Sequence, residues 1–216
     1  MITDALAKIS AAAILTISTQ LATPLVQSHV LSSHQFSLDN RYPVQSVSDV
    51  FKDNILLNLA YLDGSVKEAK DINWDQIRKP FTHEFNLEPG KTFAFHDDVL
   101  DQYKNSLIKT TQAHFNSTEG FKTDGYLFGD GVCHLASLIY WVAKDAGLES
   151  KAPTAHDFMS IPDISKEYGV SIYSNPFSKG SNAQQNLYIT NNKSKPVSFR
   201  FEYDGTNLKV SAVEVN

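Results

Sequence analysis

A glycine-rich turn followed directly by an apolar segment occupies the middle of this chain. Three glycines, Gly125, Gly129 and Gly131, lie within seven residues and end two residues before Cys133, the only cysteine. From residue 135 onward, apolar side chains recur at helical spacing as far as Gly147, a residue type that favours the end of a helix. The pattern predicts a buried helix with Cys133 in its first turn.

A cysteine in such a position can act as a nucleophile. The first N–H groups of a helix lack internal partners, and the helix dipole favours negative charge there. A thiol at this point is expected to ionise more easily, and the same N–H groups can receive an oxyanion during acyl transfer. The other interpretation is that Cys133 is a small buried apolar residue, as free cysteines often are. The residues alone leave both interpretations open.

The composition excludes several classes of function. The chain has 216 residues, a net charge of −5 and no basic run, so we expect no binding to nucleic acid. A single cysteine excludes an internal disulfide framework and a cysteine-rich metal site. The histidines that could join Cys133 in a zinc site contain no closely spaced ligand pair, so we predict no metal and no cofactor; they are His83, His96, His114 and His156. We expect a monomer.

Residues 1–28 resemble an export signal or a membrane-edge anchor. A short apolar core at 11–17 follows Lys8, and small residues at 26–28 offer a cleavage site. Asp4 and the polar residues 18–20 fit an ordinary amphipathic helix instead. We predict export and proximity to the membrane, with cleavage of the segment left open.

The remaining pattern predicts an α+β fold. Residues 29–80 are interpreted as a linker followed by a helical extension, with the linker at 29–43 and a helix at 46–62. The apolar helix that begins at the glycine turn is expected to pack on a mainly antiparallel sheet, and residues 81–216 to form one domain. Strands are predicted at 81–87 and 92–96, joined as a hairpin, and at 168–174, 187–190, 197–203 and 208–213, with a short helix at 97–109.

Several of these segments together resemble the VanW family. Residues 129–134, Gly-Asp-Gly-Val-Cys-His, are similar to a family signature in which a glycine-rich turn and Val-Cys-Gln open a helix. Residues 87–95 resemble a Pro-Gly-Glu-Thr-Phe-Ser-Phe element, residues 121–126 its Gly-Tyr lead-in, and residues 187–201 its strand–Asn-Asn turn–strand ending. The resemblance covers residues 82–213. The chain departs from the family at His134, which replaces the Gln, and around residues 169–171, which replace an Asp-Ala-Thr element.

The resemblance implies a cell-envelope protein, linked to glycopeptide resistance, in which the cysteine serves an L,D-transpeptidase. On this hypothesis the Cys133 thiolate attacks a peptide carbonyl and His156 is first base and then acid. Asp163, or less favourably Asp157, orients His156. Backbone groups at Gly131 and His134 form the oxyanion site. Substrate-binding residues are expected to be Gly129, Asp130, Tyr126 and Tyr168.

Other interpretations compete with this hypothesis. His134 could replace His156 as the base, but neighbouring residues of a helix point about 100° apart, so packing is favoured. The aromatic side chains could belong to the hydrophobic core rather than line a substrate groove. The order Cys, helix, His is shared with papain-like and transglutaminase-like hydrolases. The rival from another class is a noncatalytic envelope module that binds peptidoglycan stem peptides while Cys133 is structural.

Overall fold

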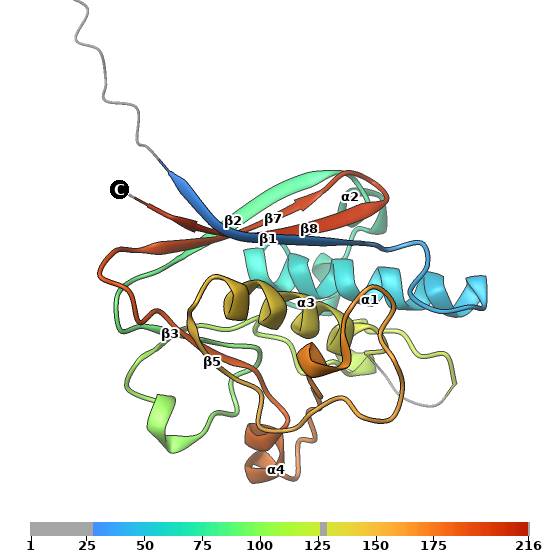
Figure 1. Cartoon of the computed structure of the whole chain (residues 1–216). Helices are drawn as coiled ribbons and strands as arrows, with labels where there is room; N and C mark the ends of the chain where they lie inside the picture. Colours follow the sequence, from blue (N-terminus) through green and yellow to red (C-terminus); the bar gives the residue numbers. More distant parts are fainter. Residues whose placement is uncertain (1–27, 126–128, 216) are drawn as a thin grey trace, which may run out of the picture.

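The computed structural model describes residues 28–125 and 129–215, and this part of the chain contains two four-stranded sheets (Figure 1). The helices are α1 (Gln45–Asp63), α2 (Trp74–Ile77), α3 (Val132–Asp145) and α4 (Lys179–Gln184). The strands are β1 (His29–Ser37), β2 (Phe81–Leu87), β3 (Thr92–Ala94), β4 (Leu107–Lys109), β5 (Glu149–Lys151), β6 (Tyr188–Thr190), β7 (Val197–Tyr203) and β8 (Asn207–Glu214). The predicted α+β class is confirmed.

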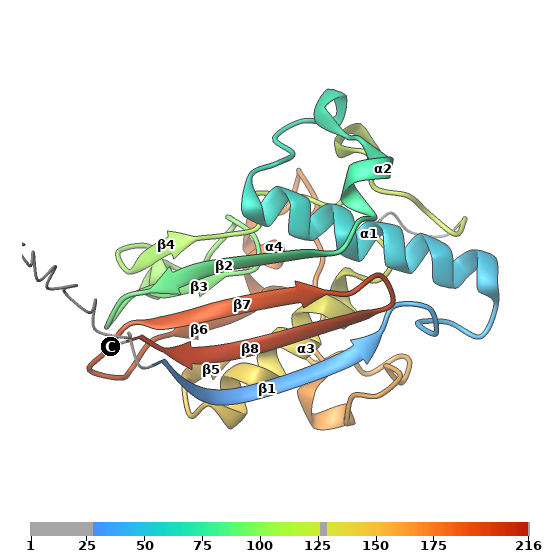
Figure 2. The ribbon, with the colours of Figure 1, turned by 90° about the horizontal axis from the view of Figure 1, so that it is seen from above.

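The first sheet is antiparallel, in the order β1-β8-β7-β2, and α1 and α3 cover one of its faces (Figures 1 and 2). Alternation places Phe199 and Phe201 of β7 on the covered face, where both are fully buried and stack on Phe85 of β2. Strands β7 and β8 form the predicted hairpin, with Tyr203 opposite Leu208. This sheet supplies the surface against which the central helix packs.

The interpretation of residues 29–43 as a linker was wrong, because residues 29–37 form the edge strand β1. Strand β1 pairs with β8 along its length, for example His34 with Val210. An edge strand needs few apolar side chains, and only Phe36 of this strand is buried. The sheet of the predicted domain at 81–216 therefore includes a strand that precedes it in the chain.

The predicted hairpin at 81–96 was also wrong, although both strands exist. Strand β2 pairs with β7 of the first sheet, whereas β3 pairs with β6 and β4 of the second sheet, whose order is β4-β3-β6-β5. The Gly90 N–H donates to the Asn191 carbonyl at 2.7 Å, which holds the intervening turn where the chain changes sheets. Residues 97–109 form a 3₁₀ turn (Asp101–Tyr103) and β4 rather than a helix.

Helices α1 and α3 agree with the predicted ones. Helix α1 ends at Gly64, whose φ of 81° is the left-handed conformation that glycine adopts at such ends. Helix α3 begins one residue before Cys133, as the glycine turn predicted. Its apolar face is fully buried against β1, β5, β8 and α1. The first turn of α3 thus has a fixed place beneath the first sheet.

One predicted strand is not formed, and the predicted export segment cannot be compared with the structure. Residues 168–174 form no strand and have a single bridge, between Ala155 and Val170. Side chains of α3 instead bind their backbone: the Ser137 hydroxyl accepts from the Val170 N–H at 2.9 Å. The predicted export segment, residues 1–28, lies outside the described residues except for residue 28. Within the described ranges, none of the helices combines the length and apolarity needed to cross a bilayer.

Candidate functional site

The first turn of α3 is held tightly against α1. Gly131 caps the helix with a φ of 99°, and a Cβ at this position would lie 2.7 Å from the Phe51 carbonyl oxygen. Only glycine fits this conformation and this close approach. The His134 N–H, predicted as an oxyanion donor, already donates to the Gly131 carbonyl at 3.0 Å. The turn therefore fixes the position of Cys133. One of the N–H groups expected to bind an oxyanion is already engaged in a hydrogen bond within the turn.

The Cys133 thiol forms hydrogen bonds with the backbone of Ile172. The Ile172 N–H donates to the sulfur at 3.4 Å, and the sulfur lies 3.5 Å from the Ile172 carbonyl oxygen as a donor. Desolvation by the surrounding protein raises the pKa of the thiol to about 11, and the Asp130 carboxylate acts in the same direction, although the residue itself is only half-buried. The expectation of an easily ionised thiol was wrong, because desolvation of the thiolate outweighs the helix end.

The predicted base, His156, makes its described contacts with groups other than this thiol. Its Nδ1 lies 3.0 Å from the Met159 carbonyl oxygen, and its ring packs against the Phe158 and His134 rings, with centroids 4.0 and 6.3 Å away. No described hydrogen bond joins it to Cys133. Burial lowers the pKa of His156, which keeps the ring neutral at neutral pH. The structure thus places the His156 ring beside His134, the residue that follows Cys133, without a hydrogen bond to the sulfur.

The remaining predicted catalytic and oxyanion residues are also engaged elsewhere. The Asp163 carboxylate accepts from the Arg41 guanidinium at 2.6 Å. His134 is buried in edge contact with Phe51, and burial lowers its pKa to about 3. Its Nδ1 has no hydrogen-bond partner within the described residues. The structure does not assemble Cys133, His156 and Asp163 into a triad.

Three of the four predicted substrate-binding residues are described, and each contacts a different part of the protein. Gly129 lies against Phe115, where a Cβ would meet the phenylalanine side chain at 2.7 Å. Burial raises the pKa of Asp130, which accepts from the Asp124 N–H, to about 6. Tyr168 stacks on Trp141 of α3, and Tyr126 lies outside the described residues. Among the described residues, Gly129, Asp130 and Tyr168 do not line one common pocket.

A polar cleft of about 570 Å³ opens beyond the residues that the sequence singled out. Three segments line it: the residues after β3, the loop at 114–118 and the segment at 174–179. The lining residues are Asp97, Asp98, His114, Asn116, Thr118, Ser174, Pro176 and Lys179. We call this the polar cleft. Ser174 lies two residues after Ile172, so the segment that Cys133 binds continues directly into the cleft wall.

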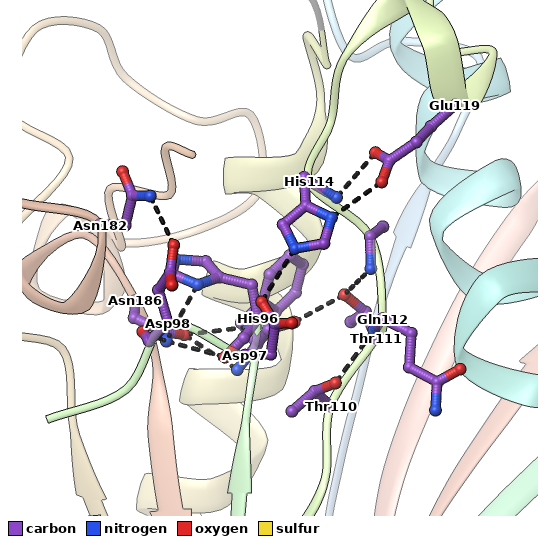
Figure 3. A network of polar contacts seen from close by, with 12 residues as sticks. His96, Asp97, Asp98, Thr110, Thr111, Gln112, His114, Glu119, Asn182 and Asn186 are labelled. Carbon is purple, nitrogen blue, oxygen red and sulfur yellow. Dashed lines mark hydrogen bonds and ion pairs between the residues drawn. The ribbon is translucent and has the colours of Figure 1, made fainter. Parts of the chain in front are cut away.

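A charged histidine forms part of this wall (Figure 3). His114 lies between two carboxylates: Nδ1 is 2.9 Å from Glu119 and Nε2 is 2.9 Å from Asp97. The Glu119 hydrogen bond, with the Asp97 charge, raises the pKa of His114 to about 9, so the ring is an imidazolium at neutral pH. From the sequence, His114 was considered only as a possible zinc ligand. No spacing of nearby residues in the sequence predicts its ion pairs with Asp97 and Glu119.

Two buried asparagines support the part of the wall around Asp98. The Asn186 amide accepts from the Phe95 N–H at 2.9 Å and donates to the Asp98 carbonyl at 3.0 Å. Asn182 of α4 points at the Asp98 carboxylate and donates to it at 2.6 Å (Figure 3). The side chains on this wall are therefore placed by hydrogen bonds between segments far apart in the sequence.

Another, smaller cavity of about 240 Å³ borders His156 and the exposed Phe158. It shares no lining residue with the polar cleft. Within the described ranges, no group of three or more histidine, cysteine, aspartate or glutamate side chains is arranged to hold a metal ion.

The region that contains α3, the polar cleft and most of both sheets matches a family model. The model described as "VanW like protein" matches residues 81–213. The chain belongs to the VanW family. This membership makes it a VanW-type cell-envelope protein, and the matched region contains every lining residue of the polar cleft. Comparison of this VanW chain with curated proteins and with solved structures gives no match.

Proposed function

We propose that this VanW protein is a noncatalytic module of the cell envelope that binds peptidoglycan stem peptides in the polar cleft. The observation that carries the proposal is the environment of Cys133. The thiol is protonated at neutral pH and bonded to Ile172, while His156 and Asp163 contact other groups. On this proposal the sulfur has a structural role, because it positions the segment that leads to Ser174.

The polar cleft has the size and chemistry of a peptide site. A volume of about 570 Å³ falls within the range of about 300–1,000 Å³ common for ligand pockets. Its wall offers carboxylates, an imidazolium, hydroxyls and an amide, which can pair with peptide N–H, carbonyl and charged groups. The lining also exposes more apolar than polar area, so the cleft can accommodate the carbon chains of a peptide as well as its polar and charged groups.

Calorimetric titration of the full chain with defined muropeptides tests the proposal. Cys133→Ser keeps a hydroxyl that can replace both contacts with Ile172, so we expect the Kd for stem peptides to stay within about twofold of wild type. Mass spectrometry is expected to find the muropeptides unchanged. Cross-linked dimers or shortened stems that appear with wild type and vanish with Cys133→Ser would overturn the noncatalytic function.

Acyl transfer is the second candidate, favoured by the place of Cys133 in the first turn of α3, behind Gly131. In that mechanism Cys133 attacks a stem-peptide carbonyl, the thioester forms as the amine leaves, and a second amine or water resolves it. His156 is the proposed base, with Asp163 orienting it. A thioester-sized mass increase on wild type but not on Cys133→Ser is the expected signature, and hydrolysis of papain or transglutaminase type would shorten the stems.

Export through residues 1–28 belongs to the same proposal, because stem peptides lie outside the cytoplasmic membrane. Cell fractionation of the full chain tests it. Loss of the extracytoplasmic pool on deletion of residues 1–28 is the expected result, and an unchanged distribution would contradict it.

A further inference from the structure

The charges of the polar cleft are not balanced within the protein. His114 is shared between Asp97 and Glu119, so its positive charge is compensated. The Asp98 carboxylate accepts from the neutral amide of Asn182, and Lys179 is exposed. Neither Asp98 nor Lys179 has an ion-pair partner among the residues that the structure describes. Asp98 and Lys179 are therefore available to a ligand, beside a His114 group in which two carboxylates share one positive charge.

The two uncompensated charges belong to neighbouring parts of the wall. Lys179 and Asn182 are three residues apart in α4, so they share one side of this short helix, with Cβ atoms about 5–6 Å apart. Asn182 in turn contacts the Asp98 carboxylate, and both Asp98 and Lys179 line the polar cleft. The two charged side chains form no salt bridge with each other among the described residues.

We propose that Asp98 and Lys179 recognise an amino-acid zwitterion, a free ammonium and a free carboxylate on one carbon, within the stem peptide. This inference rests on the proposed function and names the ligand group more narrowly. Asp98 would accept from the ammonium, and Lys179 would donate to the carboxylate, both through charge-assisted hydrogen bonds. A stem with a diamino-dicarboxylic acid residue supplies this group at the end of a side chain. A lysine-type stem supplies only the ammonium.

Three synthetic stems distinguish these possibilities by calorimetry on the full chain: one with the free diamino-dicarboxylic side chain, one with its side-chain carboxylate amidated, and one with lysine. We expect wild type to bind the free side chain at least about tenfold more tightly than the amidated one. Lys179→Gln should bring this ratio close to one, because the partner of the carboxylate is lost. Asp98→Asn keeps an acceptor for Asn182 and should weaken all three stems.

Matched controls lie on β5, away from the polar cleft. Glu149→Gln and Lys151→Gln each remove one exposed charge, and we expect both to keep the wild-type affinities and ratio. The ratio of free to amidated stem is measured within each variant, so a partly unfolded sample does not imitate the expected change.

The possible failures are distinct. Equal binding of free and amidated stems by wild type, with no effect of Lys179→Gln, overturns the zwitterion inference and leaves stem-peptide binding standing. Absence of binding by all three stems overturns the proposed function itself. A preference for the free stem that survives in Lys179→Gln places the recognition elsewhere and also rejects the inference.

Discussion

Arg41 and Asp163 form an ion pair at 2.6 Å although 122 residues separate them. The Arg41 side chain is fully buried, lies over the Phe36 ring and also donates to the Pro162 carbonyl at 3.1 Å. The pair ties the loop that contains His156 to the connection between β1 and α1. The Asp163 carboxylate thus helps to hold this loop in place.

We expect Asp163→Asn to lower the free energy of unfolding by about 1–3 kcal/mol, because it leaves the buried Arg41 charge without its counter-charge. The loss should be smaller than for a fully buried ion pair, because the Asp163 side chain is about half exposed to solvent. Asparagine tolerates the φ of 65° at this position, so the backbone conformation is kept. Urea unfolding measures the change. The matched control is Asp157→Asn, whose partner Lys166 is exposed and 3.6 Å away, and it should change stability by less than about 0.5 kcal/mol.

Gly131→Ala should destabilise the protein strongly. The new Cβ would lie 2.7 Å from the Phe51 carbonyl oxygen, and the φ of 99° is strained for any other residue, so we expect a loss of about 2–4 kcal/mol. Gly125→Ala is the control, because its φ is also positive at 117° but nothing lies within 4 Å of the added atom. Equal melting temperatures for the two variants would show that the contact with α1 is not what demands glycine at residue 131.

The parts of the fold with strong local signals could be predicted, and those held by distant backbone contacts could not. Helix α3 follows from its glycine turn and apolar period, and the β7–β8 hairpin from alternation around Asp204 and Gly205. Strand β1 is polar, and its pairing depends on main-chain bonds to β8, far along the sequence. The hairpin at 81–96 was misread because a turn residue pattern does not say whether the second strand stays in the same sheet.

The candidate site likewise combines features that local sequence predicts with features that depend on contacts between distant segments. The position of Cys133 in the first turn of a helix was predictable, but its protonation depends on desolvation, which outweighs the opposing hydrogen bond from the Ile172 N–H, 39 residues away. The polar cleft collects side chains from three separate segments, placed by Asn182 and Asn186. The spacing of residues within any one of these segments does not predict such a cleft.

The charge on His114 should make stability depend on pH. Its folded pKa of about 9 exceeds the unfolded value of about 6.5, so the stabilisation is complete below pH 6.5 and is lost as the pH rises through 9. Because the side chain is 41% exposed, we expect a loss of only about 1–2 kcal/mol over this range. Urea unfolding at pH 6, 7.5 and 9 measures it. His114→Gln should lack this part of the slope, and a wild-type profile in the variant would contradict the assignment.

Asn186→Ala should loosen the wall of the polar cleft. The buried amide accepts from the N–H groups of Phe95 and His96 and donates to the Asp98 carbonyl, so its removal leaves several buried groups unpaired. We expect a loss of about 2–4 kcal/mol in the free energy of unfolding. The exposed Asn192→Ala should change stability by less than about 0.5 kcal/mol. Similar urea midpoints for both variants would argue against this network as the support of the wall.

The Cys133 thiol should react slowly with iodoacetamide in the folded protein. With a pKa of about 11, roughly one thiol in 10⁴ is ionised at pH 7, whereas an unfolded cysteine with a pKa near 8.5 is ionised to a few per cent. We therefore expect alkylation at pH 7 to be at least about 100-fold slower than in urea, and to accelerate steadily up to about pH 11. Mass spectrometry follows the reaction. A fast reaction at pH 7 with a rate that no longer rises above neutral pH would identify a stabilised thiolate, and acyl transfer would then displace stem-peptide binding as the function of this site.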